Sequence, residues 1–300
     1  MLKRYKNNPI ITAKNLPYEA ANVFNPGAVF FNNKYILLLR VMLKTGISVL
    51  GLAESQDGYN FTIHPEPVMV PETEGPFAKY ETKGIEDPRI TKIGKEYYIF
   101  YSAYSEFGTR IGLAKTEDFK SFTRLGFTTT SDYRNCVLFP EKINKNYIRL
   151  ERPNIHPWGI WISYSPDLLH WGRQELIMTP SKINVWEDFK IGPGVPPIKT
   201  EAGWLSIYHA TTQTMDGQTY RLGVALHDLK NPSNIIGKAD AYILGPEENY
   251  ELVGYVHNVV FTCGAIVQGD NIKIYYGGAD SCVNLAEGSI EELVRLCLKG

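Results

Sequence analysis

The feature that most constrains the fold is a series of short apolar runs separated by tight polar turns, repeated along the chain. In the first copy, residues 28–31 and 35–39 flank a turn, and residues 47–53 follow as a third run. Apolar runs of this length around a short turn rich in Asn or Gly are typical of a β-hairpin. Further copies occupy residues 89–114, 138–165, 194–226 and 262–280. The chain is therefore predicted to be built from repeated antiparallel hairpins.

Each copy has to bury both faces of its strands, which a single hairpin cannot do alone. The copies must therefore pack around a common channel. Five copies predict an all-β fold, a five-bladed β-propeller with one copy in each blade; a β-sandwich with irregular strands is the alternative. Ser289 before residues 290–296 predicts a short C-terminal helix, since Ser caps helices and acidic residues fill the first turn. With no linker-like break, residues 1–300 are expected to form one domain.

The composition excludes several classes of partner. A formal net charge of −1 argues against nucleic acid or an anionic membrane as a bulk electrostatic partner. The 19 Tyr, 13 Phe and 5 Trp suit β-structure and also suit stacking on sugars. No apolar run approaches the roughly 18 residues of a membrane-spanning helix, and no apolar core of a signal peptide follows the N-terminus. The protein is expected to be cytoplasmic.

The four cysteines are scattered, without a CxxC pair or the spacing of metal ligands. They are Cys136, Cys263, Cys282 and Cys297. Buried free thiols in a reducing compartment are the expected state, and no metal site is predicted.

An acidic turn stands just before the second copy, in the sequence Gly84-Ile-Glu-Asp-Pro-Arg89. Proline fixes its own φ and pushes the preceding residue out of helical geometry, so Asp87 is expected on a rigid, extended turn close to Arg89. An acid held beside a fixed cation suits a proton donor or a ligand-binding group. An ordinary surface ion pair is the alternative interpretation of these residues.

Several polar residues are predicted to converge on one mouth of the channel. In a propeller the first strand of each copy lines the channel, so residues at the start of a copy or at the end of its second strand come together. These residues are Asn22, Arg40, Asp87, Arg134, Asn135, Lys190, His209, Tyr220 and Asp280. One or two carboxylates would face two Arg, a Lys, a His and a Tyr. Such donors indicate an anion, and phosphate fits their type and number.

Six blocks of the sequence resemble the β-mannoside phosphorylases of glycoside hydrolase family 130, in the same order along nearly the whole chain. They are GIEDPRI, YRNCVLFPEKI, KIGPGVPP, YHA, YRLGVAL and YGGAD, which begin at Gly84, Tyr133, Lys190, Tyr208, Tyr220 and Tyr276. The resemblance implies a five-bladed propeller enzyme that cleaves β-mannosides with inorganic phosphate, inverts the anomeric centre and forms α-D-mannose 1-phosphate. Phosphate would be a co-substrate, and no cofactor is implied.

The same resemblance implies roles for individual residues. Asp87 would be the proton donor, acting through a sugar hydroxyl. The phosphate would be bound by Arg134, Asn135, Lys190, His209 and Tyr220. The substrate would also contact Asn22, Arg40 and Asp280, with Arg152 as a further candidate near the anion. This division makes chemical sense, because phosphate is already an anionic nucleophile and needs cations where an inverting hydrolase needs a second carboxylate.

Other readings of the same residues remain open. An arabinanase-like propeller hydrolase would need three carboxylates in the channel, for which Asp87, Glu141 and Asp280 are candidates. A non-catalytic glycan-binding propeller would show no dependence on phosphate. Among phosphorylases, β-1,2-mannobiose or short β-1,2-mannooligosaccharides are favoured, and β-1,4-mannosyl-N-acetylglucosamine or β-1,4-mannooligosaccharides are alternatives. Acceptor choice is expected to depend on loops at residues 69–83 and 211–219, and a homo-oligomer is left open.

Overall fold

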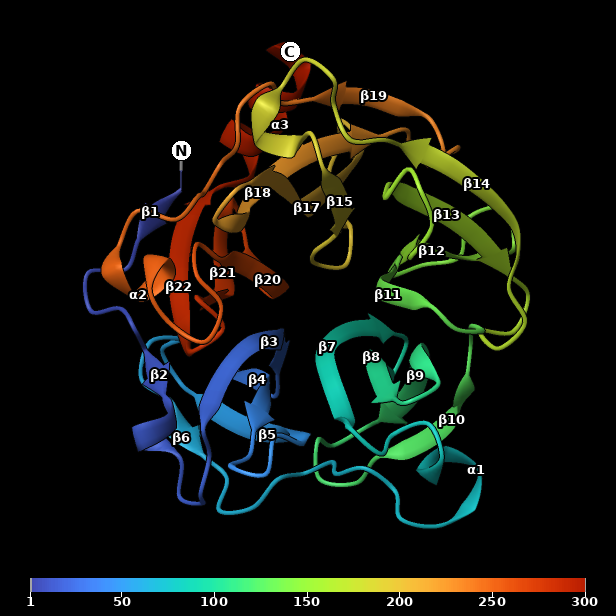
Figure 1. Ribbon diagram of the computed structural model, residues 1–300. Coiled ribbons are helices and arrows are strands. Elements are labelled where there is room, and N and C mark those ends of the chain that lie inside the picture. Colours follow the sequence, from blue (N-terminus) through green and yellow to red (C-terminus); the bar gives the residue numbers. More distant parts are fainter. Residues whose placement is uncertain (1, 300) are drawn as a thin grey trace.

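The repeated hairpins of the sequence form antiparallel sheets that stand around a common axis (Figure 1). The computed structural model describes residues 2–299, and the strands of these residues belong to four sheets. The largest sheet has eight strands, and its two halves are joined by a single parallel residue pair, Ser48 with Gly84. Divided at that pair, the strands form five antiparallel groups. The expectation of an all-β fold is confirmed.

Each group runs outward from the axis in the order of the chain (Figure 1). The innermost strands are β3 (Asn22–Phe31), β7 (Gly84–Ile93), β11 (Tyr133–Leu138), β15 (Lys190–Pro193) and β20 (Val260–Gln268). The second strands are β4 (Lys34–Met42), β8 (Glu96–Ser105), β12 (Tyr147–Pro153), β17 (Trp204–Thr214) and β21 (Asn271–Gly278). The third strands are β5 (Ser48–Ser55), β9 (Gly108–Thr116), β13 (Ile160–Ser165), β18 (Gly217–His227) and β22 (Cys282–Ser289).

The outer edge closes the arrangement. Outer strands are β6 (Thr62–Ile63), β10 (Thr123–Phe127), β14 (Gly172–Met178) and β19 (Ile235–Lys238), and β16 (Ile198–Lys199) also pairs with β17. The last group takes its outer strands from the other end of the chain, because β1 (Lys3–Arg4) and β2 (Ile11–Thr12) both pair with β22. The two ends of the chain are thus bound into one sheet. This pairing protects the edge of β22 from solvent.

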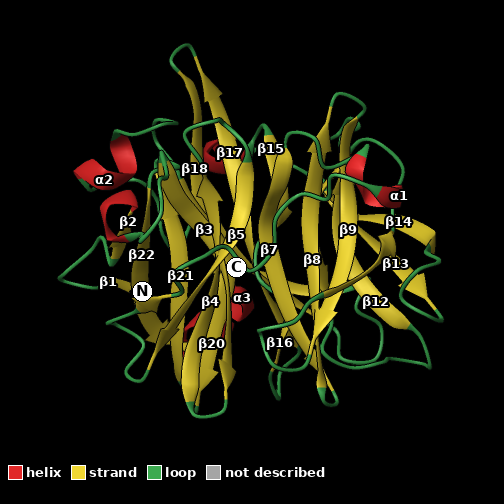
Figure 2. Ribbon diagram, turned by 90° about the horizontal axis from the view of Figure 1, so that it is seen from below, coloured by secondary structure: helices red, strands yellow, loops and turns green. Residues whose placement is uncertain are grey.

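Helical segments are short. They are α1 (Gly75–Ala78), α2 (Asn249–Leu252), α3 (Ile290–Lys299) and the 3₁₀ turns Ala13–Asn15 and Val185–Glu187. The predicted C-terminal helix is confirmed as α3, which buries Leu293 and Cys297. Figure 2 shows α1 and α2 at the same end of the sheets. No helix within residues 2–299 has the length and apolar character to span a membrane.

Apolar side chains fill the space between neighbouring groups. Phe139 after β11 meets Trp204 of β17 edge to face, for example, with ring centroids 5.2 Å apart. The four cysteines are buried free thiols, as expected from their spacing. The expected loop at residues 211–219 is instead the end of the long β17–β18 hairpin, in which Thr211 pairs with Tyr220 and Thr214 with Gly217. The alternation of polar and small residues there hid a continuous strand pair.

Candidate active site

Three inner strands are interrupted by bulges at the same level of the channel. The pairing of β3, β7 and β11 with their neighbours shifts between Phe24 and Gly27, between Glu86 and Arg89, and between Arg134 and Val137. Each bulge contains one residue with a left-handed backbone: Asn25 at φ 46°, Asp87 at φ 52° and Asn135 at φ 56°. Asn and Asp tolerate this conformation better than most residues, and a bulge re-aims the side chain that it carries.

Asn22 is the one predicted site residue that does not line the central cavity. Asn22 pairs with Met42 at the start of β3, and it is Asn25 that lines the central cavity. The bulge explains the difference, because its left-handed residue is the one turned into the channel, and a regular strand register cannot reveal that.

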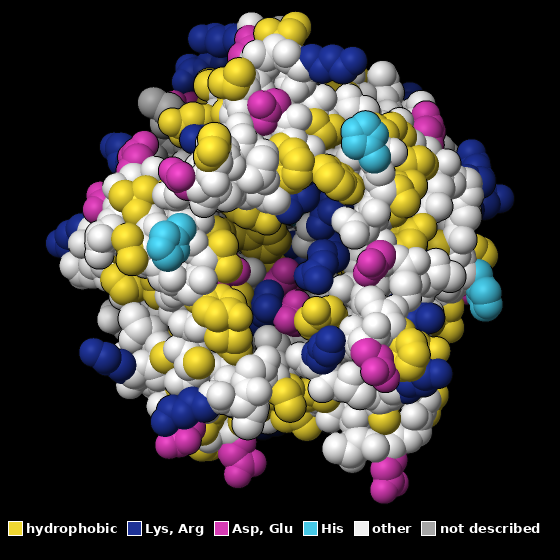
Figure 3. Space-filling model, in the orientation of Figure 1, with side chains coloured by type: hydrophobic (Ala, Val, Ile, Leu, Met, Phe, Trp, Pro, Cys, Tyr) yellow, Lys and Arg dark blue, Asp and Glu magenta, His cyan; other side chains and the backbone are white. Residues whose placement is uncertain are grey.

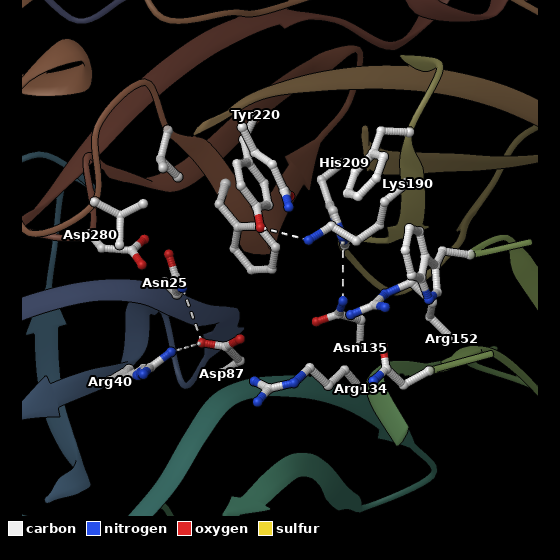
Figure 4. Close-up of a pocket in the computed structure, with 17 residues that line it drawn as sticks. Asn25, Arg40, Asp87, Arg134, Asn135, Arg152, Lys190, His209, Tyr220 and Asp280 are labelled. Carbon is white, nitrogen blue, oxygen red and sulfur yellow. Dashed lines mark hydrogen bonds and ion pairs between the residues drawn. The ribbon is translucent and has the colours of Figure 1, made fainter. Parts of the chain in front are cut away.

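The predicted convergence is otherwise observed. A cavity of about 400 Å³ opens at the axis, where Figure 3 shows Lys and Arg side chains next to Asp and Glu. Its lining includes the remaining predicted residues, several of which are labelled in Figure 4: Arg40, Asp87, Arg134, Asn135, Arg152, Lys190, His209, Tyr220 and Asp280. The central cavity is also lined by residues that were not predicted from the sequence: Asn25, Asn154, Trp158, Phe189, Gln218, Val256, Val259 and Phe261.

One wall of the cavity, the acidic wall, is a set of mutually paired charges. Asp87 is 6% exposed and accepts hydrogen bonds from Asn25 Nδ2 and Arg40 Nη1, each at 3.0 Å. Arg40 also binds Glu86 at 2.7 Å through Nη2. Burial acts to raise the pKa of Asp87, but Arg40 and Arg89 outweigh it and hold the pKa below its usual value. Asp87 is therefore an ionised carboxylate in the empty protein.

Asp280 completes this wall in a different protonation state. It follows β21, and both Ala279 and Asp280 have a left-handed backbone. Burial, with repulsion from Asp87 and Glu86, raises the pKa of Asp280 to about 7 against the opposing effect of Arg40. Near neutral pH Asp280 thus exists partly as a carboxylic acid, which can donate a hydrogen bond to a substrate oxygen.

On the opposite wall, the cationic wall, Arg134 has one distant acidic contact, with Glu86 at 3.7 Å, and within residues 2–299 neither Arg152 nor Lys190 has an ion pair with a carboxylate. Arg152 is 4% exposed, and its Nε and Nη1 atoms have no hydrogen-bond partner. Burial and then the charge of Arg134 lower the pKa of Arg152 to about 10. Lys190 donates to the hydroxyl of Tyr220 at 2.8 Å, and burial followed by Arg152 and Arg134 lowers the pKa of Lys190 to about 7. Unpaired buried cations are costly, so this wall is suited to an anionic ligand.

His209 supplies a neutral group beside these cations. Burial and the charge of Arg152 hold the pKa of His209 well below its usual value. Asn135 Nδ2 lies 3.3 Å from His209 Nε2, while Asn135 Oδ1 accepts from Arg89 Nη2 at 3.3 Å. This amide orientation makes Nε2 the acceptor and leaves the proton on Nδ1, which is buried without a partner.

Arg89 is a structural residue that the sequence analysis did not place among the site residues. Its guanidinium is buried and donates to the carbonyl oxygens of Gly194 at 2.8 Å and Asp87 at 2.9 Å. Together with its bond to Asn135, these contacts tie β7 to the neighbouring inner strands. The Pro88-Arg89 pair of the motif thus fixes the bulge that presents Asp87.

A second cavity, of about 470 Å³, adjoins the first. Its lining shares Arg40, Arg134 and Asp280 with the first cavity and adds Glu86 and Tyr104 among others. The site therefore has two lobes that meet beside Asp87.

The three carboxylates of a propeller hydrolase are not brought together. Glu141 is exposed and pairs with Lys199 at 2.7 Å, and it does not line either cavity. Across residues 2–299 no cluster of three or more His, Cys, Asp or Glu side chains is arranged to hold a metal ion. The site thus combines the ionised Asp87 with a cationic wall.

An acid and a set of cations that line one cavity are suited to an enzyme with an anionic substrate. The chain belongs to glycoside hydrolase family 130, whose family model, described as β-1,4-mannooligosaccharide phosphorylase, matches residues 2–299. The recognition made from the sequence blocks is confirmed, and the chain is an enzyme of the glycoside phosphorylase type.

Curated relatives and a solved structure match almost end to end. A 1,2-β-oligomannan phosphorylase of Thermoanaerobacter sp. is 40% identical, over 95% of this chain and 96% of the relative. A β-1,2-mannobiose phosphorylase of the same organism is 38% identical, over 95% of this chain and 96% of the relative. The structure of the Listeria innocua β-1,2-mannobiose phosphorylase in complex with β-1,2-mannobiose is 30% identical, covers 100% of this chain and 99% of that chain, and superimposes with a TM-score of 0.91.

Proposed function

We propose that this enzyme catalyses the inverting phosphorolysis of β-1,2-mannobiose or short β-1,2-mannooligosaccharides, with inorganic phosphate as co-substrate and α-D-mannose 1-phosphate as product. The observation that carries the proposal is the buried guanidinium of Arg152, which has no acidic partner among residues 2–299 and lies beside Lys190 in the same cavity as the ionised acid Asp87. The names of the β-1,2-specific relatives support the linkage. The description of the family model makes a β-1,4-mannooligosaccharide the alternative.

We also propose that the five antiparallel groups are the blades of one β-propeller, forming a single domain over residues 1–300. The single residue pair between β5 and β7 supports a blade boundary there. The pairing of β1 and β2 with β22 supports closure of the ring in the last blade.

The proposed roles follow the two walls. Asp87 is the proton donor, and Arg40, Asp280 and Asn25 hold the mannose ring beside it. The phosphate lies against the residues of the cationic wall: Arg134, Asn135, Arg152, Lys190, His209 and Tyr220. Cations here neutralise the nucleophile's charge and position it, whereas a carboxylate would repel it. Phosphate is a co-substrate, and no cofactor is part of the proposal.

The proton balance of the reaction is consistent with an ionised Asp87. A phosphate oxygen attacks the anomeric carbon as the bond to the leaving oxygen breaks. The Asp87 carboxylate takes up a proton when the substrates bind and passes it through a sugar hydroxyl to the leaving oxygen, so it ends as a carboxylate again. The proton of hydrogen phosphate is released once the phosphate is esterified, and this release balances the uptake by Asp87. Because Arg40 and Arg89 favour the carboxylate, protonated Asp87 releases its proton readily.

The reaction can be tested in the synthetic direction. The enzyme is incubated with α-D-mannose 1-phosphate and either mannose or N-acetylglucosamine, and phosphate release is followed. Release with mannose and a β-1,2 linkage in the product, determined by NMR, is the expected result. A β-1,4 product would support the alternative linkage. Absence of phosphate release, with phosphate-independent hydrolysis of a β-mannoside, would instead identify a hydrolase. No turnover of either kind, with retained sugar binding, would identify a glycan-binding protein.

A further inference from the structure

Glu86 lines the second cavity and contacts Arg40 and Arg134, two cations that line both cavities. Its Oε1 atom accepts from Arg40 Nη2 at 2.7 Å and lies 3.5 Å from the hydroxyl of Ser48. Its Oε2 atom lies 3.7 Å from Arg134 Nη1. Burial and the charge of Asp87 raise the pKa of Glu86, against the opposing effects of Arg40 and Arg134. Glu86 therefore binds Arg40 closely through Oε1 and Arg134 only at a longer distance through Oε2.

Arg134 is more exposed than the other two arginines of the site, Arg40 and Arg152. Its side chain is 38% exposed and lines both cavities, whereas Arg152 is almost fully buried. Figure 4 shows the Arg134 side chain extended toward Asp87, while Arg152 lies with Asn135 and Lys190. A long, part-exposed ion pair contributes little free energy. An anion that enters beside Arg152 and Lys190 can therefore compete for Arg134 at small cost.

We propose that Glu86 is a positioning residue that holds Arg134 at the junction of the two cavities in the empty enzyme and releases it to the incoming phosphate. The inference rests on the proposed function, since it requires phosphate to bind at the cationic wall. Phosphate carries up to two negative charges and accepts two hydrogen bonds from one guanidinium, whereas Glu86 offers Arg134 a single oxygen at 3.7 Å. Glu86 keeps its bond to Arg40 throughout, so the acidic wall is unchanged when Arg134 leaves.

Equilibrium binding of phosphate alone tests this role without any sugar turnover. In Glu86→Gln the Arg134 side chain is no longer held, so the phosphate Kd measured by calorimetry should fall about threefold, the value expected for a part-exposed ion pair. In an Arg134→Gln background the same Glu86→Gln change should leave the phosphate Kd unaltered. Asp188→Asn serves as the control for general charge, since Asp188 is an exposed carboxylate two residues before Lys190.

The possible outcomes separate this role from the proposed function. An equal gain in phosphate affinity in both backgrounds, or an equal gain in Asp188→Asn, would show a long-range charge effect and overturn the role of Glu86. Phosphate binding that does not respond to Glu86→Gln would also overturn it and leave the proposed function standing. Failure of the unaltered protein to bind phosphate would overturn both.

A structural measurement covers the case in which Glu86→Gln does not fold. Crystal structures of the unaltered protein without and with phosphate should show the Arg134 guanidinium leaving Glu86 and bonding to the phosphate oxygens. An Arg134–Glu86 contact that is the same in both structures would overturn the inference.

Discussion

On the acidic wall of the cavity two carboxylates are paired with an arginine, whereas on the cationic wall Arg152 and Lys190 have no carboxylate partner among the described residues. Asp87 and Glu86 share Arg40, and Asn25 adds a further donor to Asp87. Within residues 2–299 neither Arg152 nor Lys190 has an ion pair with a carboxylate, although both are largely removed from water.

The difference between the walls indicates which ligand group each wall is suited to bind. A paired wall keeps its protonation and geometry before the substrate arrives, which suits an acid and the hydroxyls of a neutral sugar. An unpaired wall holds charge at a cost in folding free energy, and only an anionic ligand compensates that cost. One wall of the cavity is therefore electrostatically balanced without a ligand, and the other wall is balanced only when an anion is bound.

The largest effect is expected from Asp87→Asn, which keeps the shape of the side chain but removes its ability to take up and give a proton. The amide can still accept from Asn25 and Arg40, so the fold and sugar binding should persist. The kcat for phosphorolysis of β-1,2-mannobiose should fall about a thousandfold or more. Kinetics and sugar calorimetry give the two readouts, and Glu141→Gln, on the exposed surface, is the control. Turnover like that of the unaltered enzyme would rule out Asp87 as the acid.

Lys190→Gln should weaken the cationic wall without disturbing the acidic one. Loss of a hydrogen bond between Lys190 and the charged phosphate weakens phosphate binding, and the phosphate KM should rise about tenfold or more. Lys190 is charged below its pKa of about 7 and neutral above it, so its contribution to phosphate affinity is present at acidic pH and lost as the pH rises through about 7. This dependence should vanish in Lys190→Gln, while the ionisation of phosphate itself affects both proteins equally.

The measurement for Lys190 is the phosphate KM between about pH 6 and pH 8 in both proteins. Lys199→Gln provides the control, since Lys199 is an exposed lysine paired with Glu141. The same pH dependence in Lys190→Gln as in the unaltered enzyme would show that Lys190 does not titrate against phosphate.

A smaller effect, on stability, compares two arginines of β12. Arg152→Met removes a buried cation without an acidic partner and should raise the free energy of unfolding by about 1 kcal/mol while abolishing phosphate binding. Arg149→Met should lower the free energy of unfolding. Arg149 is 1% exposed and pairs with Glu151 at 2.6 Å, so its removal leaves a buried carboxylate without a partner. Unfolding in phosphate-free buffer measures both. Equal destabilisation by the two changes would contradict the distinction between paired and unpaired charge.

Much of the secondary structure follows from the local sequence. Hairpins, turns and the C-terminal helix are specified by neighbouring residues, so their positions were predictable, as with Ser289 before α3. The extended backbone expected of Asp87, from the effect of Pro88 on the residue before it, is not observed: Asp87 has a left-handed backbone, with φ 52°, in the bulge of β7. That Asn25 rather than Asn22 lines the cavity was not predictable in this way, since the bulge at Asn25 depends on how β3 pairs with β4.

The sequence by itself determined the repeated antiparallel hairpins, the family and most of the residues that meet at the axis. The tertiary structure decided their physical state: which arginines are buried, which carboxylate is ionised and which cation has no partner. Arg149 and Arg152 are both arginines of one strand, yet one is neutralised by Glu151 and the other faces the cavity. Burial and pairing are set by groups far apart in the chain, so no local pattern contains them.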